Sequence, residues 1–241
     1  MDSLTTAAAS GMRSRLEALD LLANNIANAS APGFKTDHEF YGQYLSAEAS
    51  SEAGTVTTLP VVERNWTDFS QGSLVATGNP LDVALSGKGF LTAKSPSGAV
   101  FTRAGALHLS PQGELQTQDG YPILDSNGKA IPADASKPIE ITPDGTVRQD
   151  GQDLTRIAVV DFPDLSALNK QGHAYFSSNA QPVPSSALIE QGKIETANSQ
   201  PAESAVRLVG VMRQFDMLQR AMSIGTDMNK RALDEVARIA S

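Results

Sequence analysis

Apolar residues recur every three or four positions near both ends of this 241-residue chain, and that pattern limits the folds available to it. The spacing is that of the a and d positions of a coiled coil. A helix with a single apolar stripe cannot bury the stripe alone, so the ends must pack on each other or on other chains. The pattern therefore favours assembly over catalysis. The stripes are Ala9, Met12, Leu16, Leu19, Ala23 and Ile26, then Leu208, Val211, Phe215, Leu218 and Met222, resuming at Ala232, Val236 and Ile239.

Short β-like runs separated by turn residues fill the centre of the chain. Asn-Gly and Asp-Gly pairs between alternating residues indicate β-hairpins. No stretch long enough for a crossover helix lies among them, so the strands are expected to be antiparallel. The candidate strands are 81–85, 89–93, 100–103, 107–109, 114–117 and 156–162. The turn signals are Ser97-Gly98, Gln112-Gly113, Asp119-Gly120, Asn127-Gly128, Asp144-Gly145 and Asp150-Gly151.

These patterns predict an α+β fold with a discontinuous helical polymerisation domain and an inserted β-rich domain. The helical domain comprises 1–35 and 199–241, whose long helices are expected to form a coiled-coil-like pair. The antiparallel β-rich domain is expected over 60–198. Residues 36–59 are expected to be a linker or loop, because 46–58 is small, polar and acidic without periodicity.

The last helix is expected to open after Asn198-Ser199, with Pro201 and Glu203 in its first turn, and to extend as far as Ile239. Acidic residues precede basic residues by four positions along it, and each such pair adds about 0.2–0.5 kcal/mol to an exposed helix. The helix is thus expected to be solvated on one side and apolar on the other. The pairs are Glu203/Arg207, Asp216/Arg220, Asp227/Arg231 and Asp234/Arg238.

Three asparagines crowd the expected end of the first helix, although asparagine disfavours helix interiors. Asn24 and Asn28 share a helix face, and Asn25 neighbours Asn28. A fraying helix end and a specific structural role both fit this cluster. Pro32-Gly33 predicts a turn, because proline presets φ and glycine accepts a positive φ.

Composition excludes several classes of function. A net charge of −8 provides no basic footprint for nucleic acid. The lack of cysteine excludes disulfides, thiol catalysis and cysteine-based zinc sites. No apolar run approaches the roughly 18 residues needed to span a bilayer, and the N-terminus lacks the pattern of a cleaved signal peptide. A cytoplasmic protein, or one exported without cleavage, is expected.

A search for a catalytic, cofactor-binding or metal-binding site finds no candidate. The side chains of Asp37-His38-Glu39 are adjacent and do not converge on one ion. Ser86-Gly87-Lys88-Gly89 fails the phosphate-loop pattern at two positions. His108 is expected on the outer face of a strand, His173 in a loop, and Trp66 in packing at the mouth of the β-rich domain. The sequence therefore predicts a non-enzyme without a cofactor.

Residues 23–35, ANNIANASAPGFK, closely resemble the N-terminal signature of flagellar rod and hook proteins, A-N-N-L-A-N-x-x-T-x-G-[FY]-K. Ala31, Leu85 and Thr196-Ala197 depart from the usual residues. Chain length and residues 213–217 look more like the proximal-rod F-type than the distal-rod G-type. Further blocks resemble the family in collinear order: 69–74, 77–84, 87–90, Phe101-Thr102-Arg103-Ala104-Gly105, 112–115, 119–124, and 191–195 with Asn198.

The resemblance implies a structural axial subunit of the bacterial flagellar basal-body rod, a structure that spans the periplasm. Its terminal helices would line a hollow torque-transmitting tube, and the β-rich middle would form an outer layer. The implied partners are other rod subunits, further copies of the chain and the flagellar type III export apparatus, with no nucleic acid and no membrane insertion. The residues expected to mediate assembly are Met12, Leu16, Leu19, Asn24, Asn25, Ile26, Asn28, Gly33, Phe34, Leu208, Val211, Phe215, Leu218, Met222, Val236 and Ile239.

Three alternative functions remain open. A β-rich binding module on a helical stalk would show an exposed apolar or aromatic patch on the β domain. A distal-rod or hook subunit would share the architecture proposed above. A cell-wall hydrolase would need a carboxylate pair in a cleft, for which the sequence offers no candidate.

Overall fold

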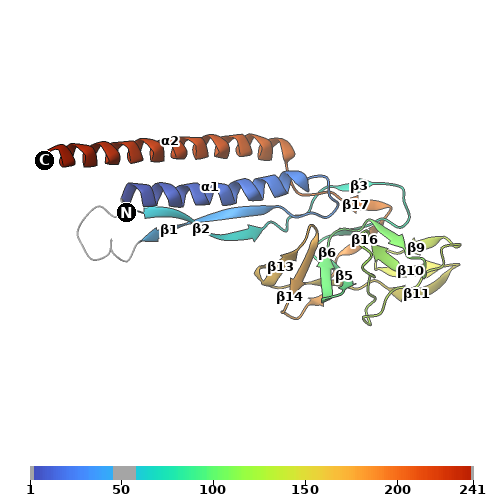
Figure 1. The fold of residues 1–241 in the computed structure, drawn as a ribbon. Helices are drawn as coiled ribbons and strands as arrows, with labels where there is room; N and C mark the ends of the chain where they lie inside the picture. Colours follow the sequence, from blue (N-terminus) through green and yellow to red (C-terminus); the bar gives the residue numbers. More distant parts are fainter. Residues whose placement is uncertain (1–2, 46–57, 240–241) are drawn as a thin grey trace. The chain divides into compact units, whose positions relative to one another are not determined.

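A computed structural model describes residues 3–45 and 58–239 and has an α+β fold (Figure 1). Every strand pairing among these residues is antiparallel. The helices are α1 (Ser3–Ala27), the 3-10 helix η1 (Leu165–Ala167) and α2 (Pro201–Ile239). The strands are β1 (Asp37–Leu45), β2 (Thr58–Thr67), β3 (Leu74–Ala76), β4 (Val83–Ser86), β5 (Phe90–Ser95), β6 (Gly98–Thr102), β7 (Leu107–Leu109), β8 (Leu115–Thr117), β9 (Ile139–Ile141), β10 (Thr146–Gln149), β11 (Gln152–Arg156), β12 (Val159–Asp161), β13 (Leu168–Gln171), β14 (Tyr175–Ser178), β15 (Val183–Pro184), β16 (Leu188–Gln191) and β17 (Lys193–Glu195).

The chain divides into two compact units, each assembled from separate segments. The terminal unit comprises Met1–Ala27, Asp37–Thr67 and Gln200–Ser241, and the β-rich unit comprises Asn28–Thr36 and Asp68–Ser199. In the terminal unit, α1 lies between α2 and the β1–β2 hairpin (Figure 1). The two helices run antiparallel, and Gly11 lacks a Cβ where Leu218 of α2 approaches.

Strand β1 differs from the linker predicted over 36–59. Its residues pair with β2 from Asp37 opposite Thr67 to Leu45 opposite Thr58. Phe40, Tyr41 and Tyr44 are aromatic residues that favour strands, whereas the linker prediction came from the composition of 46–58. Residues 46–57 of that segment lie outside the described residues. The sequence placed the start of the β-rich domain at residue 60, whereas β2 lies in the terminal unit and the β-rich unit resumes at Asp68.

The β-rich unit consists of a six-stranded sheet and several smaller ones. The strand order of the large sheet is β13-β14-β6-β5-β12-β15, and a three-stranded sheet has the order β11-β10-β9. Strand pairs β16-β4, β17-β3 and β7-β8 complete the unit. A largely aliphatic core, with Leu85, Leu91 and Ile123 among its members, lies between these sheets, and four buried phenylalanines form a second cluster.

The predicted turn signals coincide with left-handed backbone. Asp150 and Gly151 have φ angles of 52° and 77° and join β10 to β11. Two consecutive positive φ angles are typical of a type I′ hairpin turn. The predicted strand 107–109 is confirmed as β7, whereas the run 156–162 contains the end of β11 and the shorter β12. Local turn chemistry therefore indicated the hairpins correctly.

A membrane-crossing segment needs both length and high hydropathy. No helix within residues 3–45 and 58–239 combines the two.

Candidate assembly site

The interface between α1 and α2 contains a small apolar cluster. Ala18, Leu22 and Val211 are buried there, with Leu19 and Leu208 packed against them. Among the residues whose side chains the structure describes, this cluster is much smaller than the core of the β-rich unit. Intrachain packing therefore covers only part of the apolar surface of the terminal helices.

The buried face of α1 is not the stripe predicted from the sequence. Leu16 is 49% exposed, and Met12, Leu19 and Ile26 are only half-buried. Small side chains on the opposite part of the helix allow its neighbours to approach closely, so that face is buried instead. The buried positions are Gly11, Ser14, Ala18, Leu22 and Asn25.

On α2, the predicted stripe is the least exposed face. Val211 is buried in the cluster with α1, and Leu218 lies beside Gly11. Phe215 and Met222 are half-buried. Val236 and Ile239 belong to α2, but their side chains lie outside the described residues.

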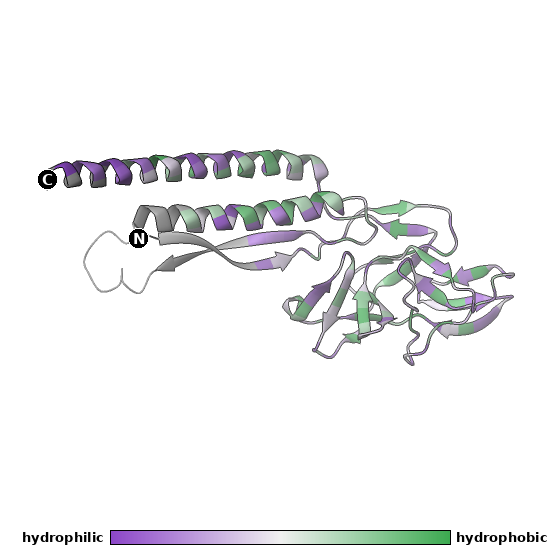
Figure 2. Ribbon diagram, viewed as in Figure 1, coloured by the Kyte–Doolittle hydropathy of each residue, from purple (hydrophilic) through white to green (hydrophobic). Residues whose placement is uncertain are grey.

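A second apolar face of α2 is exposed. Val206, Met217, Ile224 and Met228 have exposed fractions of 75%, 62%, 60% and 66%. Their spacings of 11, 7 and 4 bring them within roughly 40° of one another around the helix axis. We call these four residues the outer stripe. Figure 2 shows apolar residues along much of α2 and hydrophilic residues towards its C-terminal end.

Three of the four predicted ion pairs along α2 do not form in the described part of the chain. Arg207 donates to Glu39 of β1 over 2.6 Å, and does not pair with Glu203. No ion pair joins Asp216 to Arg220, or Asp227 to Arg231, in the described part of the chain. Arg207 instead links α2 to the hairpin, because the Glu39 side chain is almost completely buried and a buried carboxylate needs a cation.

The asparagine cluster at the end of α1 includes one residue with a defined structural role. Asn25 is buried; its side-chain amide donates to the Asp37 carbonyl over 2.7 Å and accepts from the Asp37 N–H over 3.0 Å. These two bonds join the last turn of α1 to the start of β1, so a fraying end does not describe Asn25. Asn24 is exposed and Asn28 is half-buried.

Gly33 and Phe34, predicted to mediate assembly, are instead enclosed in the β-rich unit. Phe34 N–H donates to the Ala31 carbonyl, which confirms the turn at Pro32-Gly33. Gly33 has φ of 68°, and a Cβ there would lie 2.3 Å from the backbone of Arg103. Phe34 is 0% exposed. A fully enclosed side chain offers no surface to another subunit, so these residues anchor the segment that follows α1.

Three buried charged side chains meet beside this anchor. Lys35 Nζ lies 2.5 Å from Glu195 Oε1, and Arg103 Nη1 lies 3.1 Å from Glu195 Oε2. Lys35 also donates to the Ser70 carbonyl, and the Gly72 N–H donates to Glu195. We call Lys35, Arg103 and Glu195 the ion cluster.

Burial shapes the electrostatics of the ion cluster. Desolvation lowers the pKa of Lys35, and the charge of Glu195 opposes that shift. Removing one partner from a buried ion pair leaves an uncompensated charge, which is strongly destabilising. The cluster therefore holds together segments that are far apart in the sequence.

Asn198 extends the same network. Its side chain accepts from the Thr36 N–H over 2.9 Å and donates to the Asp68 carbonyl over 2.7 Å. Sequence reasoning missed the network, because its members are up to 162 residues apart. The available signal was that Lys35, Arg103, Glu195 and Asn198 all occur in blocks that resemble family motifs.

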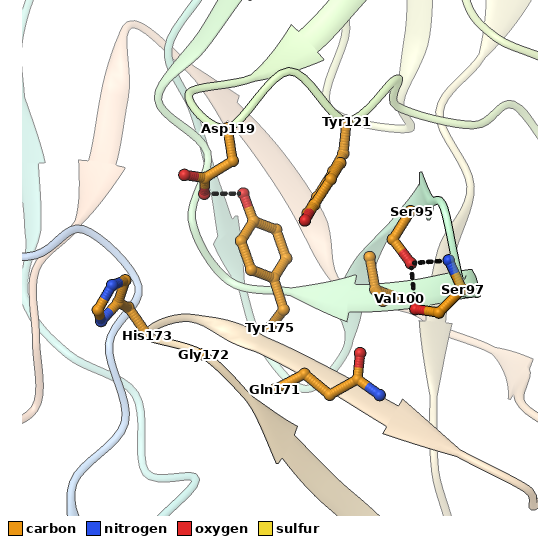
Figure 3. Close-up of a pocket in the computed structure, with 9 residues that line it drawn as sticks. All are labelled: Ser95, Ser97, Val100, Asp119, Tyr121, Gln171, Gly172, His173 and Tyr175. Carbon is orange, nitrogen blue, oxygen red and sulfur yellow. Dashed lines mark hydrogen bonds between the residues drawn. The ribbon is translucent and has the colours of Figure 1, made fainter.

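A pocket of about 300 Å³ in the β-rich unit tests the binding-module alternative (Figure 3). Two pairs of its polar groups bond to each other: Tyr175 Oη lies 2.6 Å from Asp119, and the hydroxyls of Ser95 and Ser97 lie 3.0 Å apart. Burial raises the pKa of Tyr175, so its hydroxyl stays protonated and donates to Asp119. These bonds involve four of the polar side chains that line the pocket. It is lined by Ser95, Ser97, Val100, Asp119, Tyr121, Gln171, Gly172, His173 and Tyr175.

The run Asp37-His38-Glu39 has other contacts within the terminal unit. His38 stacks on Trp66 with 4.9 Å between the ring centroids. Trp66 therefore packs in the hairpin, which corrects its predicted place in the β-rich domain. Within the described ranges, no three His, Cys, Asp or Glu residues are grouped to hold a metal ion.

Comparisons with known proteins identify the family. The description "Flagella basal body rod protein" matches residues 6–35, "Flagellar hook protein FlgE/F/G D1 domain" matches 84–149, and "Flagellar basal body rod FlgEFG protein C-terminal" matches 190–235. The chain is 31% identical to the flagellar basal-body rod protein FlgF of Caulobacter vibrioides over 226 residues, which cover 92% of each chain.

Other relatives include F-type and G-type proteins. FlgF of Mesorhizobium japonicum is 29% identical over 82% of this chain and 83% of its own. FlgG of Bacillus subtilis is 29% identical over 76% of each chain. Together the matches support the F-type over the G-type. The chain belongs to the family of flagellar basal-body rod proteins.

Proposed function

We propose that this chain is a structural axial subunit of the flagellar basal-body rod, polymerising through its terminal helices into a hollow tube that transmits torque. Family membership supports a place in the basal body and other rod components as partners. The support for the F-type favours the proximal over the distal rod. One observation carries the proposed mode of assembly: six of the twelve exposed large apolar side chains among the described residues lie on α2.

Burial of apolar surface is the proposed driving force. At roughly 25 cal/mol per Å², about 1,000 Å² of apolar surface would contribute about 25 kcal/mol before the entropy of ordering is subtracted. Head-to-tail contacts that do not close into a ring generate an open helical assembly. In such an assembly, coiled-coil-like packing between helices of neighbouring subunits would cover the apolar face that α1 leaves exposed.

The proposed role is structural rather than catalytic, with no cofactor. The relatives are rod proteins, and Tyr175 and Asp119 in the pocket of the β-rich unit are bonded to each other. Export through the flagellar type III apparatus without a cleaved signal is part of the same proposal. It rests on the resemblance of the chain to axial proteins.

Charge substitutions on the outer stripe test the proposed polymerisation. The double variant Met217→Asp, Ile224→Asp places two carboxylates on the exposed apolar face. We expect it to lose self-assembly in sedimentation and electron microscopy, and to lose motility when it replaces the native protein. Circular dichroism should show an unchanged β-rich unit.

The matched control is Gln219→Asp with Ser223→Asp, which adds the same charge to exposed positions of α2 away from the outer stripe. This variant should assemble and support motility. Normal assembly and full motility of the Met217, Ile224 variant at native abundance would show that polymerisation does not use this surface.

A further inference from the structure

We propose that the pocket of the β-rich unit drawn in Figure 3 binds a neutral sugar ring. Its volume of about 300 Å³ lies at the lower end of the range of small-molecule sites, roughly 300–1,000 Å³. A single ring that carries hydroxyl groups is a ligand of that size. Such binding is a function in addition to the proposed assembly and does not depend on it.

Three turns of the β-rich unit position the side chains of the pocket. Ser97 comes from the turn between β5 and β6, and Asp119 and Tyr121 come from the segment that follows β8. Gln171 ends β13, just before the turn into β14. Strands β5, β6, β13 and β14 belong to the six-stranded sheet. Turns held by a rigid sheet are common sites of binding, because little ordering is needed when a ligand arrives.

Three oxygen atoms of the pocket have no hydrogen-bond partner in the described part of the chain. The Tyr121 hydroxyl is one of them, and Figure 3 shows it directed into the space that the labelled side chains surround. Asp119 accepts from Tyr175 with Oδ2, which leaves Oδ1. The Gln171 amide nitrogen donates to Ser177, which leaves Oε1. A carboxylate oxygen and an amide oxygen only accept, so the lining suits a ligand rich in donors.

A sugar ring provides both the donors and the surface that this lining requires. Its hydroxyl groups donate, and hydrogen bonds to a carboxylate are among the stronger ones. The rings of Tyr121 and Tyr175 lie 5.2 Å apart at 66° and form a corner of the pocket. The C–H groups of a sugar ring are weakly positive and pack on the negative face of an aromatic ring. Val100 is the one aliphatic side chain among the described residues of the lining, so a purely apolar ligand finds little matching surface.

The charges around the pocket favour a neutral ligand. A second cavity of about 720 Å³ shares Asp119 and Tyr121 with the pocket. The charged side chains that line the two cavities are Asp119 and Glu114, which are negative, and Lys94 and Lys129, which are positive. An anion or a cation therefore gains no net attraction. Because the two cavities share a wall, a chain of several sugar rings can continue from one into the other.

Nuclear magnetic resonance titration of the full chain, below the concentration at which it assembles, tests the proposal. The probes are the methyl glycosides of glucose, galactose, mannose and N-acetylglucosamine. We expect at least one of them to shift the amide signals of Ser97, Gly120 and Gly172 with a dissociation constant on the order of 1 mM. The absence of any shift with all four at about 50 mM would overturn the proposal.

A trisaccharide of the sugar that binds distinguishes two sources of the ligand. Tighter binding than that of the single ring identifies a glycan that occupies both cavities. Equal affinity identifies a free sugar. Both results support a sugar site.

Three substitutions in the pocket remove the unpaired oxygen atoms one at a time. Tyr121→Phe keeps the ring and should weaken binding about three- to tenfold, as should Gln171→Ala. Asp119→Asn should weaken it about tenfold or more, because a charged acceptor is lost. Gln152→Ala, at an exposed glutamine of β11 outside the pocket, is the matched control and should bind normally. Unchanged affinity in all three pocket variants, each checked for folding by thermal unfolding, would overturn the assignment of the site.

Other ligands test the class of molecule that is recognised. Glycerol at the same concentration should produce no shifts, and equal shifts would show that no ring is recognised. Much tighter binding of glucosamine would identify a cationic ligand instead. The same shifts from a short uncharged peptide, without shifts from the sugars, would identify a peptide site. Each of these three results would overturn the neutral-sugar assignment.

Sedimentation of the same variants separates this inference from the proposed function. The pocket lies in the β-rich unit, so its variants should assemble as the native protein does. A chain that assembles without binding any sugar would overturn the inference and leave polymerisation standing. A chain that binds a sugar but never assembles would overturn polymerisation alone.

Discussion

In the β-rich unit, the apolar side chains of neighbouring strands cover one another, whereas in the terminal unit much of the apolar surface of α2 stays exposed. Leu85, Leu91 and Ile123 are at most 1% exposed, but Met217 and Ile224 are 62% and 60% exposed. The difference indicates that the β-rich unit completes its core alone, while the helices retain surface for other subunits.

The charged residues of the two units also differ in burial. The β-rich unit buries the ion cluster among backbone carbonyls and N–H groups, while the arginines along α2 are exposed. A buried cluster fixes one arrangement of its segments because any loosening leaves a charge without a partner. Exposed charges interact weakly and can exchange partners. The buried charges thus fix the arrangement of the β-rich unit, whereas the exposed charges of α2 are available for contacts with other subunits.

The largest expected effect comes from the ion cluster. Glu195→Gln leaves the charges of Lys35 and Arg103 buried without a carboxylate, so we expect the free energy of unfolding of the β-rich unit to fall by about 3–5 kcal/mol. Urea unfolding followed by near-ultraviolet circular dichroism measures the loss. Glu190→Gln is the control, because its pair with Lys193 is part-exposed and should contribute less than about 1 kcal/mol. Equal losses of unfolding free energy in the two variants would show that the buried ion cluster contributes no more than an exposed ion pair.

A smaller, more localised effect is expected from the α1–α2 cluster. Leu22→Ala opens a cavity among few buried neighbours, and we expect it to destabilise the helix pair by about 2–4 kcal/mol. Hydrogen exchange should accelerate in α1 and α2 but not in β5 and β6. Leu16→Ala, at a half-exposed position, should change stability by less than about 0.5 kcal/mol. Accelerated exchange throughout both units would show that they unfold as one.

The smallest effect concerns pH. Hydroxyl groups of Thr142 and Thr146 donate to Asp144 and lower its pKa from 3.8 to about 2. Since the folded-state pKa is the lower one, this stabilisation is complete above pH 4 and is lost as the pH falls towards 2. Asp144→Asn should flatten the fall in unfolding free energy between pH 4 and pH 2. Thr142→Val should flatten it in part, and an unchanged slope in both variants would contradict the assignment.

Features governed by local chemistry could be predicted from the sequence. The turn at Asp150-Gly151, the strand at 107–109 and the start of α2 at Pro201 depend on the conformational preferences of a few adjacent residues. The buried face of α1 could not be read in this way. Hydropathy highlighted Leu16, whereas packing buried Ala18, because close approach between helices depends on side-chain size as well as on hydropathy.

The ion cluster could not be predicted from the spacing of residues in the sequence either. Lys35 and Glu195 are 160 residues apart, and only the folded chain brings them together. Motif resemblance marked the segments that contain them but did not indicate that they meet. Gly33 and Phe34 were assigned to assembly because they lie in the segment that resembles the rod and hook signature, yet they belong to the β-rich unit.

Residues 28–36 belong to the β-rich unit, although the segments before and after them belong to the terminal unit. No single cut in the sequence therefore separates the two units. A chimera that exchanges the β-rich unit between rod proteins would have to carry this short segment along with 68–199. If the segment stayed behind, Glu195 would meet a foreign residue in place of Lys35. A graft designed from one consecutive stretch of sequence would therefore fail. Segments 28–36 and 68–199 have to be taken from the same parent protein.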